Sequence, residues 1–224
     1  KYDSEKEPSI GRSKAQLEEA RKRLSAAHAA KVRPHLILRA YSQFIDNFLL
    51  HLWRTLVDDG AGRHQLSLVA VGGYGRQELH PGSDIDLLIL LARACSGEEV
   101  RRIEQFIRFL WDMGLQVGHS TRTLKECVHQ ARGDITVVTN LMEARHLTGP
   151  AELLSRLNTQ IAPTRMWSPR KFFEAKRQEQ VNRHLRYGDT AYNLEPHIKE
   201  GPGGLRDIQT IQWVGHRYFG TPNL

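Results

Sequence analysis

Apolar residues recur at three- and four-residue spacing near the N-terminus, which predicts a pair of helices. Ser13 and Gln16 have the spacing of a capping box, so we expect the first helix to begin there and to continue to about Lys31. A second helix is predicted from Pro34, with a wide apolar stripe that ends before Gly60. The pair contains no grouping of reactive side chains, and we expect it to serve packing.

At Leu66 the pattern changes to short, continuous apolar runs, which are typical of buried strands. Residues 66–71 (LSLVAV) and 85–91 (IDLLILL) are two such runs, joined by a turn-rich connection. Residues 115–121 (LQVGHST) alternate between apolar and polar and predict a third strand.

Helix signals lie between and after these strands. Ser96 with Glu99 and Thr123 with Glu126 form two capping boxes, and a further helical stretch covers residues 134–141. The helix after Ser96 is expected to end near Gly114 and to present one apolar stripe, made of Val100, Ile103, Ile107, Leu110 and Trp111.

Beyond residues 148–150 (TGP) the pattern is helical to the end. The last predicted helix follows GPGGLRD, and in one interpretation of this stretch the helix packs Ile208, Ile211 and Trp213 on the core. The predicted fold class is α+β, a small mixed sheet with helices. Three parts are expected: a helical lead-in at 1–62, a catalytic domain at 63–150, and a helical domain at 151–224 that is the start of a bundle.

The composition is that of a soluble globular protein, with 40% hydrophobic and 25% charged residues among 224. No apolar stretch approaches the roughly 20 residues that span a bilayer. Two cysteines without ligand spacing, Cys95 and Cys127, argue against zinc and disulfide frameworks and fit a reducing cytoplasm. The net charge of +7 favours polyanionic partners, although most basic residues alternate with glutamates on helices and predict solvated faces.

Asp84 and Asp86 stand two residues apart where an apolar strand begins, so both project from one face of it. A single aspartate at this place is usually a turn residue. Two carboxylates so close repel each other unless a cation lies between them, and hard oxygen ligands suit Mg²⁺. Upstream, Gly72 and Gly73 let the backbone approach a ligand and offer amide groups to a phosphate, and Ser83 adds a hydroxyl.

The stretch VGGYGRQELHPGSDIDLLIL at 71–90 resembles the signature of the polymerase-β-like nucleotidyltransferase superfamily. VGHSTRTLKEC at 117–127, EARHLTG at 143–149 and above all YNLEPHIKEGPGGLRDIQTIQW at 192–213 resemble the bifunctional [protein-PII] uridylyltransferase/uridylyl-removing enzymes of bacterial nitrogen regulation. The resemblance covers the chain from about Leu66 onward.

The resemblance implies a cytoplasmic, Mg²⁺-dependent enzyme that transfers UMP from UTP to a tyrosine of the PII signal protein and releases pyrophosphate. Asp84 and Asp86 would then be catalytic and would bridge the metal ions, while Gly73 and Ser83 would hold the β- and γ-phosphates. Arg76 would neutralise the triphosphate or meet PII, and is equally consistent with a solvated turn residue.

The GPGGLRD stretch also has two interpretations. Its glycines and proline shape a loop, or its amide groups bind nucleotide phosphate or base together with Lys199 and Arg206.

Two departures from the pattern stand out. The third predicted strand supplies no carboxylate, only His119 and Ser120, so Asp134 and Glu143 become candidates for a third acidic residue. Asp134 is equally well explained as a helix N-cap after a glycine. The chain also has no His-Asp dipeptide, so we expect a fragment without the uridylyl-removing HD and glutamine-sensing ACT domains of the family.

Two other functions stay open at this point. An adenylyltransferase or RNA nucleotidyltransferase of the same superfamily would suit the positive charge, but no aromatic and basic cluster for stacking RNA is present in the sequence. We therefore do not expect nucleic acid as a partner, nor a membrane. A regulatory module that binds nucleotide without catalysis would suit the missing third carboxylate, but has little need of paired aspartates.

Overall fold

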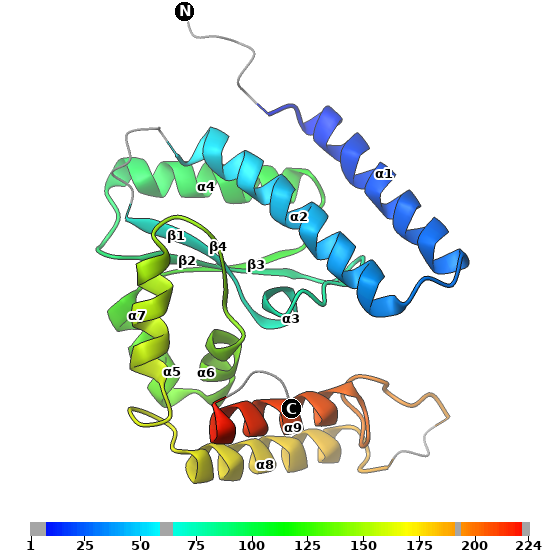
Figure 1. The fold of residues 1–224 in the computed structure, drawn as a ribbon, viewed down its shortest axis with the longest axis vertical. Coiled ribbons are helices and arrows are strands. Elements are labelled where there is room, and N and C mark those ends of the chain that lie inside the picture. The colour runs from blue at the N-terminus through cyan, green and yellow to red at the C-terminus, as the bar shows by residue number, and fades with distance from the viewer. Residues whose placement is uncertain (1–7, 59–64, 191–193, 221–224) are drawn as a thin grey trace, which may run out of the picture. The chain divides into compact units, whose positions relative to one another are not determined.

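The computed structural model describes residues 8–58, 65–190 and 194–220. Two compact units form: residues 1–127 with 140–157, and residues 128–139 with 158–224. Figure 1 labels their helices and strands. Gly60, predicted to follow the second helix, and the first two residues of the 192–213 stretch lie outside the described residues.

The two N-terminal helices are α1 (Ile10–Ala29) and α2 (Pro34–Leu56), which confirms the predicted pair. The predicted capping box at Ser13 is wrong. The Ser13 amide donates to the Ser9 carbonyl at 3.0 Å, an ordinary helical bond, and its side chain is buried. An N-cap leaves its own amide outside the helical bonding pattern, so α1 begins earlier, at Ile10.

Four strands form one mixed sheet, as the predicted fold class requires, in the order β3-β2-β1-β4. β1 is antiparallel to β2 and β4, and β2 is parallel to β3. The strands are β1 (Leu66–Ala70), β2 (Ile85–Leu91), β3 (Val117–Thr123) and β4 (Arg145–Thr148). The first three match the predicted strands, whereas β4 was not predicted. The connection after β1 contains a short helix, α3 (Gly72–Gly75), that was not predicted either.

The remaining helices lie where the sequence predicts helices: α4 (Gly97–Asp112), α5 (Leu124–Gly133), α6 (Ile135–Met142), α7 (Ala151–Ile161), α8 (Pro169–Arg186) and α9 (Leu205–Phe219). Both predicted capping boxes form. The Ser96 amide donates to the Glu99 carboxylate at 2.7 Å, and the Thr123 amide donates to Glu126 at 2.7 Å. Within the described residues, no helix is both long enough and apolar enough to cross a bilayer.

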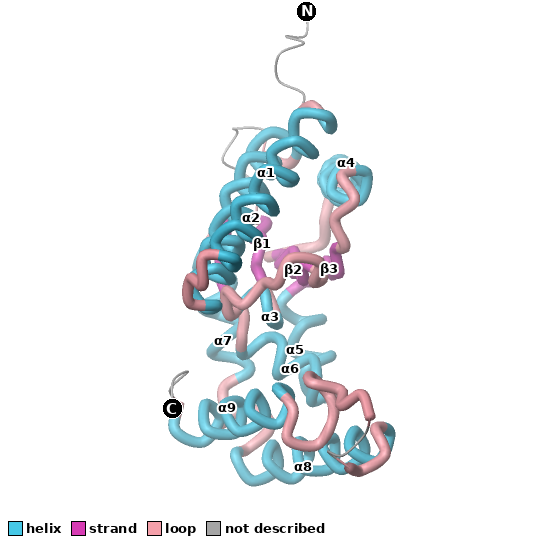
Figure 2. Tube along the Cα trace, turned by 90° about the vertical axis from the view of Figure 1, so that its right-hand side faces the viewer, coloured by secondary structure: helices cyan, strands magenta, loops and turns pink. Residues whose placement is uncertain are grey.

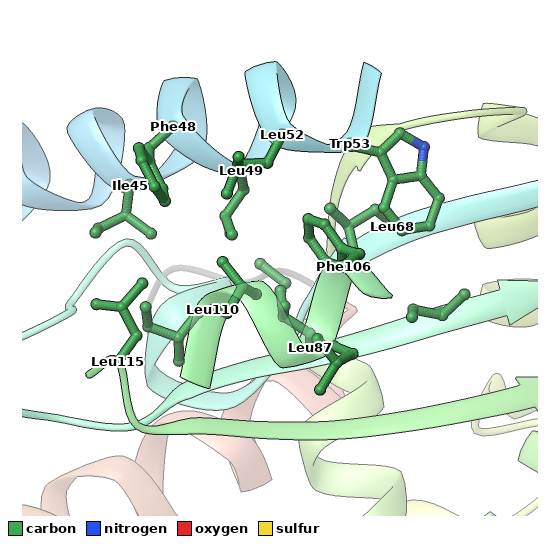
Figure 3. Close-up of a cluster of buried hydrophobic side chains, with 14 of the residues drawn as sticks. Ile45, Phe48, Leu49, Leu52, Trp53, Leu68, Leu87, Phe106, Leu110 and Leu115 are labelled. Atoms are coloured by element: carbon green, nitrogen blue, oxygen red, sulfur yellow. The ribbon is translucent and has the colours of Figure 1, made fainter. Parts of the chain in front are cut away.

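The main core lies between one face of the sheet and helices α2 and α4 (Figure 3). Leu87 of β2, Leu49 of α2 and Leu110 of α4 are among its buried residues, and Trp53 meets Phe106 edge-on at 5.3 Å between ring centroids. The odd-numbered residues of β2 supply the sheet side of this core. Its even-numbered residues therefore face the other way, which keeps that face separate from the main core.

The buried face of α4 differs from the predicted stripe. Ile103, Phe106, Ile107 and Leu110 are buried, but Val100 is 42% exposed and Trp111 is 53% exposed. The buried arc is centred nearer Phe106, so Val100 and Trp111 fall on the margin of the helix.

In the second unit, α8 and α9 pack together. The predicted packing of Ile208 and Ile211 is wrong: they are 54% and 65% exposed. The buried residues of α9 include Gln209, Trp213 and Arg217. The Nζ of the buried Lys176 lies 4.5 Å from the centroid of the Trp213 ring. α9 turns this mixed polar and aromatic side inward because α8 presents charged residues that need such partners.

The capping box of α4 generates a pH prediction. Hydrogen bonds from Arg93 and from the Ser96 amide lower the pKa of Glu99 from 4.5 to about 2. A carboxylate with a lowered pKa stabilises the fold above its unfolded pKa, and this contribution is lost as the pH falls. Glu99→Gln is expected to lower the free energy of unfolding by about 1 kcal/mol at pH 7.

The difference between native chain and variant should shrink as the pH falls through 4.5 towards 2. Urea unfolding of both proteins at a series of pH values measures it. Glu98→Gln is the matched control, because Glu98 lies beside Glu99 and is exposed. A difference that stays constant with pH would contradict the assignment.

Candidate active site

The aspartate pair follows a tight turn that ends the connection from β1 to β2. The Ser83 amide donates to the His80 carbonyl at 3.0 Å, and Gly82 has φ +89°. Pro81 followed by Gly82 is typical of a type II turn, whose third residue requires positive φ. The turn leaves Ser83 and Asp84 exposed at the start of β2.

The backbone fixes where the two carboxylates point. Ile85 donates its amide to the Gln116 carbonyl at 2.8 Å, and the Asp86 carbonyl accepts from Val71 at 3.0 Å. Ile85 is buried in the core, so Asp84 and Asp86, on either side of it, project from the opposite face. With the Gln116 amide in the orientation that satisfies both its oxygen and its nitrogen, that nitrogen donates to Asp84 Oδ1 at 3.2 Å.

Two glycines flank the Asp86 carboxylate. The register of β2 with β3 pairs Asp86 with Gly118, where a Cβ would lie 2.6 Å from Asp86 Oδ1. On the other side, a Cβ on Gly72 would lie 3.2 Å from Oδ2, and Gly72 has φ +58°. The carboxylate therefore occupies space that any side chain at Gly118 would take.

The same register places His119 and Ser120, the two polar residues predicted on β3, on opposite faces of the sheet. Ser120 pairs with Leu88 and shares the face of the aspartates. His119 pairs with Leu87 and lies on the α4 face, with its ring 5.6 Å from that of Trp111. Of the two, only Ser120 lies on the side where the aspartates are.

The glycine turn of α3 is held by a partly buried polar network that was not predicted. The Tyr74 hydroxyl donates to Asp46 of α2 at 2.6 Å, and Arg145 of β4 makes two hydrogen bonds to the same carboxylate at 2.7 and 2.9 Å. Arg145 also donates to the carbonyls of Gly75 and Tyr74 at 3.2 and 3.3 Å. Burial, and then the Asp46 charge, raise the pKa of Tyr74, which keeps it a neutral donor.

A close backbone approach accompanies this network. A Cβ on Gly75 would clash with the carbonyl oxygen of Glu143, so only glycine fits there. The Glu143 carboxylate forms an ion pair with Arg76, which also donates to Glu78 at 2.8 Å. Burial alone would lower the pKa of Arg76, but Glu143 and Glu78 raise it. Arg76 is thus neither a solvated turn residue nor an isolated charge, and Glu143 serves as its counter-ion.

Asp134, the other candidate for a third carboxylate, is the N-cap of α6. Its Oδ1 accepts from the Thr136 amide at 2.7 Å and from the Thr136 hydroxyl, and these bonds lower its pKa. The N-cap alternative is confirmed. Among the described residues, no three His, Cys, Asp or Glu side chains group in a way that could hold a metal ion. A third acidic ligand is therefore not assigned.

The GPGGLRD loop belongs to the second unit and is closed by its own hydrogen bonds. The amides of Leu205 and Arg206 donate to the carbonyls of Ile198 and Lys199, both at 2.9 Å, and the Gly203 amide donates to Asp207 at 2.8 Å. These amides have protein partners already. The Arg206 guanidinium donates to Gln209 at 2.9 Å and to Glu200 at 3.3 Å, whereas Lys199 is exposed.

Comparison with known proteins finds two protein families that this chain matches. Residues 18–123 match the nucleotidyltransferase family DUF294, and residues 171–224 match the family described as GlnD PII-uridylyltransferase. A bifunctional uridylyltransferase/uridylyl-removing enzyme of Pseudomonas putida is 50% identical over 203 residues, 91% of this chain and 22% of that protein. The enzyme of the same description from Nitrosococcus oceani is 58% identical over 157 residues, 70% of this chain and 18% of that protein. This chain belongs to the family of these enzymes.

The family membership confirms the resemblance seen in the sequence. The chain spans about a fifth of the length of these uridylyltransferase relatives. Among solved structures, a toxin–antitoxin structure with AMP-PNP is 16% identical, with a TM-score of 0.33 over 64% of this chain and 96% of that one.

The Asp46 network generates a stability prediction. Arg145→Ala leaves the Asp46 carboxylate partly buried without its main counter-ion, and is expected to lower the free energy of unfolding by about 1–3 kcal/mol. Arg170→Ala removes an exposed pair with Glu174 and should change it by less than about 1 kcal/mol. Urea unfolding compares the two. Equal, small effects would show that the network does not hold the turn.

Proposed function

We propose that the chain is a Mg²⁺-dependent nucleotidyltransferase that moves UMP from UTP to a tyrosine of the PII signal protein. The observation that carries the proposal is the Asp84–Asp86 pair on either side of Ile85 at the start of β2, with Asp86 between Gly72 and Gly118. The choice of UTP and PII rests on the description of the relatives and of the matched family. Because the chain spans about a fifth of these relatives, their hydrolytic activity is not part of the proposal.

The donor set fits divalent magnesium. Carboxylate oxygens are hard ligands, and Mg²⁺ is usually held by one or two carboxylates together with substrate phosphates. Asp84 and Asp86 would hold the ions, which would stabilise the attacking and leaving oxygens of an in-line displacement. Because Gly72 and Gly118 have no side chains, the Asp86 carboxylate fits between them.

In the proposed reaction, the tyrosine oxygen forms a bond to the α-phosphorus of UTP. The bond from that phosphorus to the bridging oxygen breaks, pyrophosphate leaves, and the phenolic proton passes to solvent. Gly72 and Gly73 let the backbone approach the triphosphate, and Ser83 adds a hydroxyl next to Asp84. Arg76 positions the turn through Glu143, because its guanidinium is already paired.

Lys199 and Arg206, which the resemblance suggests as nucleotide contacts, belong to the second unit. Lys199 is exposed and can meet an anion, whereas a nucleotide contact by Arg206 would require exchange of its bond to Glu200. We further propose that residues 63–150 contain the transfer site, that residues 151–224 begin a helical domain, and that the protein works in the cytoplasm without membrane or nucleic-acid partners.

The intact mass of PII after incubation with the chain, Mg²⁺ and UTP tests the proposal, with ATP and 2-oxoglutarate present to condition PII. A gain of one UMP is expected with the native chain. The Asp84→Asn/Asp86→Asn double variant should give none, because amides are poor magnesium ligands. Asp112→Asn, at an exposed acid that ends α4, is the matched control and should retain transfer.

Other outcomes separate the alternatives. A gain of AMP from the ATP present would identify an adenylyltransferase. No gain, despite Mg²⁺-dependent UTP binding by a folded native chain, would favour a non-catalytic nucleotide-binding module. No gain and no UTP binding would contradict nucleotide transfer altogether.

Gly118 generates a sharper prediction about the site. Gly118→Ala would place a methyl group 2.6 Å from Asp86 Oδ1 and displace the carboxylate. Displacement by about 1 Å is expected to lower kcat/KM for UMP transfer by about 10²-fold. Gly133→Ala is the control, since a Cβ there meets nothing within 4 Å and its φ is not positive. Unchanged activity of Gly118→Ala would place the reacting atoms away from Asp86.

A further inference from the structure

A cavity of about 580 Å³ lies between α4 and β3, on the face of the sheet opposite to the aspartates. Its volume is in the range of ligand-binding pockets, about 300–1,000 Å³. Its lining includes the buried Ile103 and Ile107 of α4, His119 and Thr121 of β3, and Leu91 at the end of β2. Val100 and Trp111, the two residues of α4 that were predicted to be buried, also line it and remain exposed.

β3 forms the open margin of the described sheet. It pairs with β2 on one side, and no strand of the described residues pairs with its other side. In Figure 2, β3 is the strand at the margin of the sheet on the side of α4. A sheet edge of this kind presents backbone N–H and C=O groups to which another extended chain can bond.

α4 has exposed apolar side chains at its margin beside this edge. A helix is about 10 Å across, roughly two strand spacings of ~4.8 Å, and the margin of α4 with Val100 and Trp111 extends past its buried face. Every second side chain of one more strand alongside β3 would point to the cavity side of the sheet, towards these two side chains.

β3 connects this cavity with the aspartates through its alternation. Gly118 and Ser120 lie on the aspartate face, and His119 and Thr121 line the cavity. A strand added to β3 would alternate in the same way. Successive side chains of that strand would therefore point to the aspartates and into the cavity in turn.

The residue of β3 beside Asp86 is small and exposed. Between the edge and Asp86 stands Gly118, which has no side chain. On the opposite side, Gly72 and the α3 turn lie against the carboxylate. A side chain from an added strand can therefore reach Asp86 over Gly118.

We propose that the acceptor protein docks by adding its tyrosine-bearing segment as a strand along β3. The inference rests on the proposed function and identifies how that site holds its acceptor. The tyrosine lies on the aspartate face over Gly118, and the residue next to it in sequence places an apolar side chain in the cavity below α4. Such a strand lies about 10 Å from β2, a gap that a tyrosine side chain and the reacting phosphate together span.

Steady-state kinetics with PII test the docking. Val100→Glu replaces an apolar group of the cavity wall, which also contains Glu104 and Arg108, by a charge, and Trp111→Ala removes its aromatic rim. Both residues are exposed, so both variants should fold, as circular dichroism can verify. We expect KM for PII to rise at least tenfold in Val100→Glu, with kcat and KM for UTP unchanged. Gln105→Ala, on the exposed side of α4 and outside the cavity lining, is the matched control and should change neither constant.

Tryptophan emission gives a readout that does not depend on transfer. Of the four tryptophans, Trp111 is 53% exposed, Trp167 is half-buried, and Trp53 and Trp213 are buried. Addition of PII whose acceptor tyrosine is replaced by phenylalanine should shift the emission to shorter wavelength, because the added strand covers Trp111. The Trp111→Phe variant should not show this shift.

The outcomes distinguish the two proposals. Transfer by the native chain, with KM for PII unchanged in Val100→Glu and no emission shift, would overturn edge docking and leave the transferase function intact. Absence of transfer together with an emission shift would contradict the function and support the docking. An emission shift that follows the concentration of the chain alone would show that a second copy occupies the edge, and would overturn the proposal.

Discussion

The carboxylate of Asp46 is the point on which the geometry of the site depends. It holds the Tyr74 hydroxyl, 28 residues away in sequence, and the Arg145 guanidinium, 99 residues away. Arg145 in turn bonds the carbonyls of the α3 turn. Through these contacts α2, α3 and β4 are locked together, and Gly72 is held against Asp86. Without that lock, a turn with three glycines in four residues would have many conformations open to it.

The sequence predicted those elements whose signal is local. β1 and β2 are continuous apolar runs, and α4 opens with a capping box that its own side chains complete. β4 gave no such signal, because it has four half-buried residues and no alternation. α3 was missed because a glycine-rich segment has low helix propensity. Its helical turn is imposed by the tertiary contacts of Tyr74 and Arg145.

The aspartate pair could be found in the sequence because its geometry depends only on the period of a single strand. The role of Gly118 could not, because it depends on the register of β2 with β3. A slip of one residue would set His119 beside Asp86 and turn Gly118 to the α4 face. The pairing of Arg76 with Glu143 was hidden for the same reason, since it joins residues 67 apart. These two pairings convert a recognisable motif into a defined site.

The open edge of the sheet, at β3, has exposed side chains beside it that selection for stability alone would not explain. Proteins commonly protect an open edge with proline, a bulge or a charge that points inward. His119 and Thr121 of β3 line the cavity. Beside them, Val100 and Trp111 of α4 are about half exposed. Val100 and Trp111 are 42% and 53% exposed, so covering them would stabilise a complex by roughly half of the 1.5–3 kcal/mol that full burial of a large apolar side chain contributes. A surface that keeps this free energy available, one strand away from the aspartates, is suited to binding an extended partner there.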